Sequence, residues 1–364
     1  MQRKATSKDV ADLAGVSRTA VSLVLNGHGE GNIAPEKQAL IRAAARTLNY
    51  APHAVAVSLQ SRRSSMIGVI TDQIATSAHA GMLLRGASDA AVAAGYLLLV
   101  IDTQRDPDQE VRAYDVLRNQ QVDGLLFAAM SLRPYAPPSL VPGGPAVLAN
   151  CYDPDDRVPA FVPDEIGGSR AVTNHLIEFG HRDIAMISGS HDAVAAELRE
   201  QGFREAMTAA GLSPRAPMLA GWEIDKGYAA AMQVLTGPGP LPTAIVCAND
   251  RAAVGVMLAA GALGLSVPRD LSVVGYDDDD NVAPYLVPAL TTVRLPHREM
   301  GEEAMRVVLH AVAEGGGSGR PGEPAGAEPA TVESAAGPDG DPERVPRTLL
   351  ECPLVVRDSV APPR

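Results

Sequence analysis

Polar residues at the ends of apolar segments are the side chains of this sequence that could do chemistry. Asn150, Asn249, Asp250 and Asp277 each follow an apolar run with the composition of a buried strand. Ligands of open α/β proteins bind at the carboxyl ends of the strands, so these positions predict a binding site for a polar small molecule. An aspartate after a buried strand is also a common helix cap, so a structural role for Asp250 and Asp277 stays open.

The sequence lacks the motifs that common catalytic and metal sites require. It has no G-x-S-x-G, no P-loop, no H-E-x-x-H and no G-x-G-x-x-G after the first apolar run. The adjacent carboxylates of 277–280 do not converge on an ion without help from elsewhere. Cys151, Cys247 and Cys352 are odd in number and widely spaced. We therefore predict a protein that is not an enzyme and has no metal and no cofactor.

Residues 6–26, TSKDVADLAGVSRTAVSLVLN, predict two short helices joined by a tight turn. Thr6 or Ser7 can cap the first helix, Ser17 can cap the second, and Gly15 can adopt positive φ in the turn. The apolar positions expected to face inward are Val10, Leu13, Ala14, Ala20, Val21 and Val24. This layout is typical of a helix-turn-helix, whose second helix enters a major groove; a plain αα-hairpin is the alternative.

The local charge favours DNA binding over a plain hairpin. Residues 1–63 hold nine Lys/Arg and four Asp/Glu, a net charge of +5, whereas the whole chain has −12. A basic head on an acidic body suggests that only the head meets phosphate. A third helix is expected at 35–48, with Leu40, Ile41, Ala44 and Leu48 as its packing stripe.

The length and the composition set the wider frame. With 364 residues and 46% hydrophobic content, the chain is expected to form two or three domains around well-buried cores. No charged segment followed by an apolar run opens the sequence, and no apolar run approaches 18 residues. We therefore expect a cytoplasmic protein with no membrane partner.

From residue 66 onward, apolar runs alternate with helical segments, which predicts an α/β body. Strands are expected at 66–71, 96–102, 122–129, 145–150, 183–189, 216–221, 243–250 and 271–277, with further apolar segments at 290–294 and 347–359. Helices are expected at 81–94, 107–120, 166–179, 195–210, 225–235, 251–264 and 297–313. Residues 314–346 have almost no apolar bulk and are predicted to be a disordered insertion.

Three segments together resemble the lactose-repressor/galactose-repressor (LacI/GalR) family of bacterial transcription factors. They are KDVADLAGVSRTAVSLVLNG, LNYAPHAVAVSL and MIGVI, and the resemblance runs from about Lys8 to Asp358. It implies an all-α helix-turn-helix headpiece followed by an α/β two-lobed, periplasmic-binding-protein-like body with a ligand cleft. It further implies a regulator, expected to be a repressor, that binds a pseudo-palindromic operator in double-stranded DNA as a homodimer.

The resemblance also assigns residues to DNA. Arg18 and Thr19 match base-reading positions, whereas Leu23 stands at a position that is often polar and can offer only apolar contact. The segment around Leu59 matches a hinge helix that wedges a leucine into the minor groove. The full set expected at DNA is Thr6, Ser17, Arg18, Thr19, Ser22, Leu23, Asn26, Tyr50, Ala54, Val55, Ala56 and Leu59.

Six positions match residues that hold the small-molecule effector in this family. An aromatic face with Asn, Asp and Arg edges would suit a sugar or sugar derivative, and Ala193 and Ala195 stand where a purine would be read, which disfavours a purine. Core packing for Trp222 and a solvated charge for Arg199 are the structural alternatives. The expected effector residues are His79, Asn150, Arg199, Trp222, Asn249 and Asp277.

The expected domain boundaries follow from these segments. They are a headpiece at 1–52, a hinge helix and linker at 53–65, a body at 66–358, and a tail at 359–364. Within the body, the first lobe is expected at 66–161 and 293–313, and the second at 162–291 and 347–358. The family's tetramerising tail is absent, so a dimer is expected. A transport-type sugar-binding protein, an α/β enzyme and an architectural DNA-binding protein with a vestigial body are the alternatives.

Overall fold

The computed structural model describes residues 5–50, 63–74, 81–137, 144–315 and 347–364. The chain divides into two compact units, one that ends at Met66 and includes Gln120–Asp123, and one that contains the remaining residues. We call the first unit the headpiece and the second the body. None of the helices in these described ranges is both long enough and apolar enough to cross a membrane.

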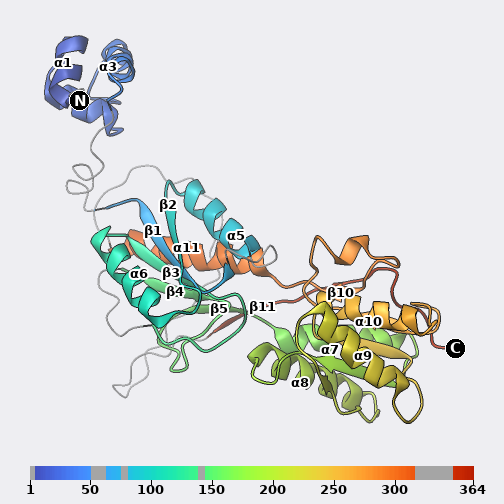
Figure 1. Cartoon of the computed structure of the whole chain (residues 1–364). Coiled ribbons are helices and arrows are strands. Elements are labelled where there is room, and N and C mark those ends of the chain that lie inside the picture. Colours follow the sequence, from blue (N-terminus) through green and yellow to red (C-terminus); the bar gives the residue numbers. More distant parts are fainter. Residues whose placement is uncertain (1–4, 51–62, 75–80, 138–143, 316–346) are drawn as a thin grey trace. The chain divides into compact units, whose positions relative to one another are not determined.

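Three short helices build the headpiece: α1 (Ser7–Ala14), α2 (Arg18–Leu25) and α3 (Pro35–Thr47) (Figure 1). Thr6 caps α1 through a capping box with Asp9, and the Ser17 hydroxyl accepts a hydrogen bond from the Ala20 N–H at 3.1 Å. Gly15 ends α1 in the left-handed region, at φ 65°. The predicted caps, turn and helices are therefore confirmed.

The headpiece has its own small core, centred on Val10, Val21 and Ile41. Two predicted core positions are wrong, because Leu13 and Leu40 are 55% and 56% exposed. The inward positions of α1 and α3 belong instead to small residues, including Ala11 and Ala45, which are 3% and 5% exposed. Small side chains allow three short helices to pack closely, which leaves the larger leucines outside.

The segment that leads into the body is held by one carboxylate. Asp123 accepts hydrogen bonds from the backbone N–H groups of Ser64 and Ser65 at 2.8 and 2.9 Å, and from the Ser64 hydroxyl at 3.1 Å. Residues 63–65 are not helical. The rest of the predicted hinge helix lies outside the described residues.

The first lobe of the body is built on a six-stranded sheet in the order β11-β5-β4-β3-β1-β2. Its pairs β1–β3, β3–β4, β4–β5 and β5–β11 are parallel. The strands are β1 (Met66–Thr71), β2 (Leu97–Asp102), β3 (Gly124–Ala128), β4 (Ala146–Ala149), β5 (Ala160–Pro163) and β11 (Thr348–Leu350).

Helices cover both faces of this sheet. The helices α5 (Gly81–Ala93) and α11 (His297–Gly315) share a core with Ile67 and Val69 of β1. The intervening residue, Gly68, faces the other way, where a Cβ would lie 2.8 Å from Leu117 of α6 (Pro107–Asn119). Alternating side chains of one strand therefore place α6 opposite α5 and α11 (Figure 1).

The second lobe repeats this architecture around a four-stranded parallel sheet in the order β7-β6-β8-β9. Met186 packs in the core shared with α7 and α8, and its neighbour Ile187 packs in the core shared with α9 and α10. The elements are α7 (Glu165–Glu178), β6 (Ile184–Ser188), α8 (Val194–Ala209), β7 (Met218–Leu219), α9 (Ile224–Thr236), β8 (Ala244–Cys247), α10 (Asp250–Ala262), β9 (Ser272–Val274) and the 3-10 turn η2 (Ala283–Tyr285).

Two expected lobe boundaries need correction. Residues 347–358 were expected in the second lobe, but β11 pairs with β5 in the first sheet, and only β12 (Leu354–Val355) returns to the second lobe. There it pairs with β10 (Thr292–Val293), so Val293 also belongs to the second lobe. The edge strand β5 can accept one more parallel strand. The chain therefore adds β11 to the first sheet before β12 pairs with β10 in the second lobe.

The prediction of a disordered insertion at 314–346 is wrong for its first two residues, because α11 continues to Gly315. Its remaining residues, 316–346, lie outside the described part of the chain. The first lobe nevertheless receives β11 directly after this interval, at Thr348.

Candidate functional site

The helix α2 and its two cap residues carry six of the twelve residues expected at DNA. Ser17, Arg18, Thr19 and Ser22 are exposed. Asn26 ends the helix, and its side-chain amide donates a hydrogen bond to the Ser22 hydroxyl at 3.2 Å. A polar surface with one arginine at a helix N-terminus suits readout of base edges in a major groove.

Three other positions expected at DNA also have structural roles. Thr6 is engaged in the capping box of α1, and Tyr50 packs against the headpiece core. Leu23 is half-buried, so less of it is available to a base than of Arg18. The hinge positions Ala54, Val55, Ala56 and Leu59 lie outside the described residues.

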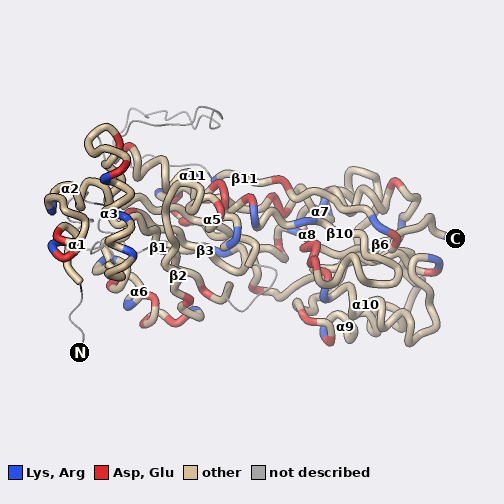
Figure 2. The backbone as a smooth tube through the Cα atoms, turned by 90° about the horizontal axis from the view of Figure 1, so that it is seen from above, with Lys and Arg blue, Asp and Glu red and all other residues tan. Residues whose placement is uncertain are grey.

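The three helices supply only the smaller part of the basic excess of the first 63 residues. Figure 2 shows basic and acidic residues interspersed on α1 to α3. Much of the excess comes from the flanks of the helical region, at Arg3, Lys4, Arg62 and Arg63. Basic flanking arms can follow phosphates while the helices read bases.

In the second lobe, the predicted effector residue Arg199 is buried and held by protein groups. Its Nε and Nη2 donate to the two carboxylate oxygens of Glu165 at 2.7 and 3.0 Å, and its Nη1 donates to the Ala248 carbonyl at 2.6 Å. Its guanidinium lies 3.7 Å from the ring centroid of Tyr276. The structure therefore does not support a solvated charge, and these protein groups use three of the five N–H donors of Arg199.

Asp277 is the carboxylate that this arrangement leaves accessible. It lies 3.6 Å from Arg199 Nη1, and its side chain is 18% exposed, whereas those of Arg199 and Glu165 are 4% and 2% exposed. Its backbone has φ 115°, a conformation unusual for a residue with a side chain. A strained position next to a buried arginine favours a functional role over simple helix capping, since no helix follows it directly.

Burial shapes the charges at this edge of the second sheet. It raises the pKa of Asp277 to about 7, against the opposing charge of Arg199. Burial also raises the pKa of Asp250 well above its ordinary value. For Arg199 burial acts to lower the pKa, but the charge of Glu165 outweighs it and the pKa is raised. The arginine stays charged while Asp277 can exchange a proton near neutral pH.

Asn249 and Asp250 hold the loops around Asp277 in place. The Asn249 carbonyl oxygen caps α10 by accepting the Ala252 N–H at 2.8 Å, and its amide donates to the Trp222 carbonyl at 3.1 Å. Asp250 accepts hydrogen bonds from the Thr292 hydroxyl at 2.6 Å and from the Asp279 N–H at 2.7 Å. Both side chains thus make hydrogen bonds that stabilise the loops, and an effector contact by Asn249 remains a prediction.

Of the other predicted effector residues, the structure describes Trp222 and Asn150. Trp222 is half-buried, and a Cβ added to Gly189 would lie 2.5 Å from its ring, so a glycine is needed beneath it. Asn150 ends β4 with φ 55° and donates to the Ala129 carbonyl at 3.0 Å. His79 lies outside the described residues. The structure thus brings Arg199, Trp222, Asn249 and Asp277 to one sheet edge and places Asn150 in the other lobe.

A second charged cluster at the carboxyl edge of the first sheet was missed by the sequence reasoning. Asp72 directly follows β1, and its Oδ2 accepts hydrogen bonds from the Nε atoms of both Arg105 and Arg133 at 3.2 Å. The rule that singled out Asp277 applies equally to Asp72. The two arginines lie in loops a few residues beyond β2 and β3, so no strand-end rule could have found them.

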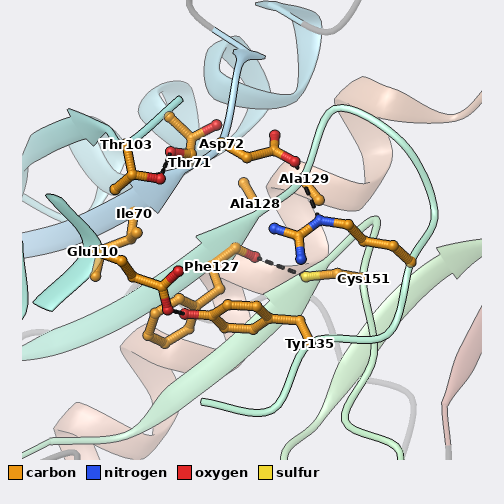
Figure 3. Close-up of a pocket in the computed structure, with 11 residues that line it drawn as sticks. Ile70, Thr71, Asp72, Thr103, Glu110, Phe127, Ala128, Ala129, Tyr135 and Cys151 are labelled. Carbon is orange, nitrogen blue, oxygen red and sulfur yellow. Dashed lines mark hydrogen bonds and ion pairs between the residues drawn. The ribbon is translucent and has the colours of Figure 1, made fainter. Parts of the chain in front are cut away.

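A small cavity lies beside this cluster, with Asp72 on one side and the Glu110–Tyr135 pair on the other (Figure 3). The Tyr135 hydroxyl donates to Glu110 Oε1 at 2.5 Å, and burial raises the pKa of Tyr135 above its ordinary value. The cavity volume of about 10 Å³ is enough for one water-sized atom and far too small for a sugar. Any larger ligand must bind outside it.

Comparison with known proteins points to one family. The profile described as bacterial regulatory proteins of the lacI family matches residues 6–53, and that of a periplasmic-binding-protein-like domain matches residues 173–334. The ribose operon repressor of Escherichia coli (strain K12) is 36% identical over 318 residues, which cover 85% of this chain and 94% of that protein. The repressor PurR of Histophilus somni (strain 129Pt) is 33% identical, with coverage of 86% and 93%.

A solved structure agrees over nearly the whole chain. The lac repressor dimer bound to operator and the anti-inducer ONPF superimposes with a TM-score of 0.77 at 27% identity, and covers 99% of this chain and 100% of that one. These relatives are transcriptional repressors, so the comparisons favour neither a transport protein nor an enzyme.

Proposed function

This chain belongs to the LacI family of bacterial regulatory proteins, and we propose that its headpiece reads a pseudo-palindromic operator under control of a sugar-like effector bound by the body. As a family member it is a DNA-binding transcriptional repressor with a small-molecule effector, and not an enzyme. It has an all-α headpiece and a periplasmic-binding-protein-like α/β body.

The observation that carries the DNA-binding assignment is the exposed, polar start of α2. Arg18 is placed to donate to a guanine, while Ser17, Thr19, Ser22 and Asn26 supply further polar contacts. Leu23 offers an apolar contact, and Ala54, Val55, Ala56 and Leu59 supply the hinge. A chain of this kind acts in the cytoplasm, associated with the nucleoid when bound to DNA.

The protein acts as a homodimer. The matched lac repressor structure is a dimer on operator, and two-fold symmetry explains a pseudo-palindromic site. The second lobe offers exposed apolar residues that a partner copy could cover: Leu258, Tyr285 and Val287 are 56%, 76% and 94% exposed.

The effector binds at the carboxyl edges of the two sheets, where Asn150, Arg199, Trp222, Asn249 and Asp277, with His79, are the proposed contacts. Asp277 supplies an acceptor for hydroxyl groups and Trp222 supplies an aromatic face. Effector binding shifts the balance between two body conformations that differ in their ability to order the hinge. Asp123 is suited to transmit that shift, because its carboxylate holds the backbone of Ser64 and Ser65.

The experiment that tests the DNA-binding assignment compares Arg18→Ala with Arg46→Ala. Both remove one exposed positive charge from the headpiece. We expect Arg18→Ala to lose about 1–3 kcal/mol of operator affinity and to relax the preference at one base pair. Arg46→Ala should weaken binding to every sequence alike. Selection of bound duplexes from a randomised pool reads out both effects, and an unchanged base preference in Arg18→Ala would falsify the base-reading role.

A second experiment tests the effector site. Asp277→Ala should abolish the response of operator binding to the effector while operator affinity without effector stays near that of the wild type. Simultaneous loss of both properties would instead make Asp277 a structural residue.

A further inference from the structure

We propose that the effector carries an anionic oxygen group, a carboxylate or a phosphate, bound by Arg105 and Arg133 at the carboxyl edge of the first lobe. This inference rests on the proposed effector-controlled function and adds a chemical class to it. An effector of this class is not a neutral sugar. The hydrogen bonds of Asp72, Arg105 and Arg133 point to this class.

Asp72 has no acceptor capacity left for a ligand. Its Oδ1 accepts the backbone N–H groups of Gln73 and Met130, both at 2.8 Å, and its Oδ2 accepts the two arginine Nε groups. A carboxylate has about four lone-pair sites, so these four bonds saturate it. Its side chain is 2% exposed. Asp72 therefore orients the two arginines and is not itself a partner for sugar hydroxyls.

The two arginines keep donors free for a ligand. Arg105 uses Nε for Asp72 and Nη2 for the Ser131 hydroxyl at 3.3 Å; Arg133 uses Nε for Asp72 and Nη1 for the Pro134 carbonyl at 3.5 Å. A guanidinium has five N–H donors, so each retains several beyond these bonds with the described residues. Their side chains are 46% and 32% exposed, so solvent and ligands can reach them.

The charges at this cluster favour an anion over a neutral hydroxyl. At Asp72 two guanidinium groups share one carboxylate, which leaves one positive charge in excess. Glu110, on the other side of the cavity, accepts the Tyr135 hydroxyl and keeps its negative charge, so the excess positive charge is confined to the arginine side. Hydrogen bonds between guanidinium groups and oxyanions are charge-assisted and bidentate geometries are available, so an oxyanion gains more than a hydroxyl does.

A buried hydroxyl supplies an independent sign that this edge binds an oxygen atom. Thr71 is 2% exposed and lines the small cavity beside Asp72, and its Oγ1 has no hydrogen-bond partner among the described residues. A buried hydroxyl without a partner is costly, and a ligand oxygen or a water in the cavity would satisfy it. The cavity volume of about 10 Å³ suits one such atom.

Paired ligands that differ only in charge test the proposal. The full-length protein is titrated by calorimetry, and screened by thermal shift, with D-ribose and D-ribose 5-phosphate, D-glucose with D-gluconate and glucose 6-phosphate, and inorganic phosphate alone. We expect at least one anionic member to bind about tenfold more tightly than its neutral partner, with an affinity that falls as salt rises. Gluconate tests a carboxylate and the sugar phosphates test a phosphate, so the two kinds of anionic group are distinguished.

Arg133→Gln and Arg105→Gln should reduce the anion preference to near unity, whereas Arg133→Lys should keep part of it. The matched control is Arg118→Gln, an exposed arginine on α6 that forms an ion pair with Asp115. Because loss of Arg133 leaves Asp72 less well paired, the readout is the ratio of anionic to neutral affinity, which a mere loss of stability would not change.

Two outcomes overturn the proposal. If a neutral sugar binds as tightly as its anionic partner and alters operator binding, the effector-controlled function stands and the anion class is wrong. If no anionic probe binds while operator binding is intact, the arginine pair is a structural ion-pair cluster.

Discussion

Each lobe of the body has a buried charged residue paired with a more accessible group of the opposite charge, and the signs are reversed between the two lobes. At the carboxyl edge of the first sheet, one buried carboxylate, Asp72, holds two partly exposed arginines. At the corresponding edge of the second sheet, one buried arginine, Arg199, holds the buried Glu165 and the more accessible Asp277. In each lobe the buried charge is satisfied by protein groups and presents the opposite charge to solvent.

The two sheet edges therefore offer different hydrogen-bonding groups to a ligand. The first edge has donors to spare and no free acceptor on Asp72, whereas the second edge has an accessible acceptor in Asp277 and an arginine whose donors are largely occupied. A ligand that engages both edges therefore needs an anionic or acceptor-rich end and a hydroxyl-rich end. A charged sugar derivative has both.

The largest expected effect comes from breaking the buried arginine. Arg199→Met leaves Glu165 as an unpaired buried carboxylate, and should lower the free energy of unfolding by about 3–5 kcal/mol. The matched change in the other lobe, Arg105→Met, removes an arginine that is 46% exposed and should cost less than about 1 kcal/mol. Urea denaturation of both variants measures the contrast, and equal costs would contradict the distinction between buried and presented arginines.

A smaller loss of unfolding free energy is expected when Asp72, which binds both arginines of the first lobe, is changed. Asp72→Asn keeps an oxygen for the backbone N–H groups of Gln73 and Met130, but turns an amide toward the two arginines. We expect a loss of about 1–3 kcal/mol in unfolding free energy, limited because water can solvate the released guanidinium groups. The control is Asp102→Asn at the end of β2, whose carboxylate accepts the Gln104 N–H. A loss no greater than that of the control would show that Asp72 does not organise this edge.

Per pH unit, a smaller effect is expected from the titration of Asp277 at the second edge. Asp277 has a pKa of about 7, above its ordinary 3.8, so the folded state holds its proton more tightly than the unfolded state does. Its contribution to stability is therefore present at low pH and is lost as pH rises through 7. The groups that act on it are Arg199, Glu165 and Asp279.

The Asp277→Asn variant isolates this contribution. Wild-type stability should fall by at most about 1.4 kcal/mol per pH unit between pH 5 and 7 from this group, and the variant should show a flatter profile. Denaturation midpoints across this pH range measure it. Parallel profiles for the two proteins would mean that Asp277 does not titrate there.

The sequence was sufficient for most of the fold, because long amphipathic helices and continuous apolar strands have clear periodicity. The strand β5 was missed because its four residues, which follow Pro159 and end at Pro163, are too few for a pattern. The placement of β11 in the first sheet was also missed. Its Leu349 is 63% exposed, so the strand lacks the buried character that would assign it to a sheet.

The candidate site was predictable only where one residue follows a strand directly. Asp277 was found in this way and Arg199 through the family resemblance, but Glu165, which pairs with Arg199, was missed because it lies far away in the sequence, on α7. Asn150 and Asn249 were found too, although both make structural hydrogen bonds. The local sequence cannot reveal which polar group is saturated by the fold and which is left for a ligand.

The most direct test of the central claim is the operator affinity of the full chain with and without a ligand of the body. An operator selected from random duplexes is labelled, and its Kd is measured by fluorescence anisotropy at zero and at saturating ligand, using the probe that most raises the melting temperature. Coupling between the two sites predicts a change in Kd of about 5- to 150-fold. A ligand that saturates the body and leaves the operator Kd unchanged would contradict the account.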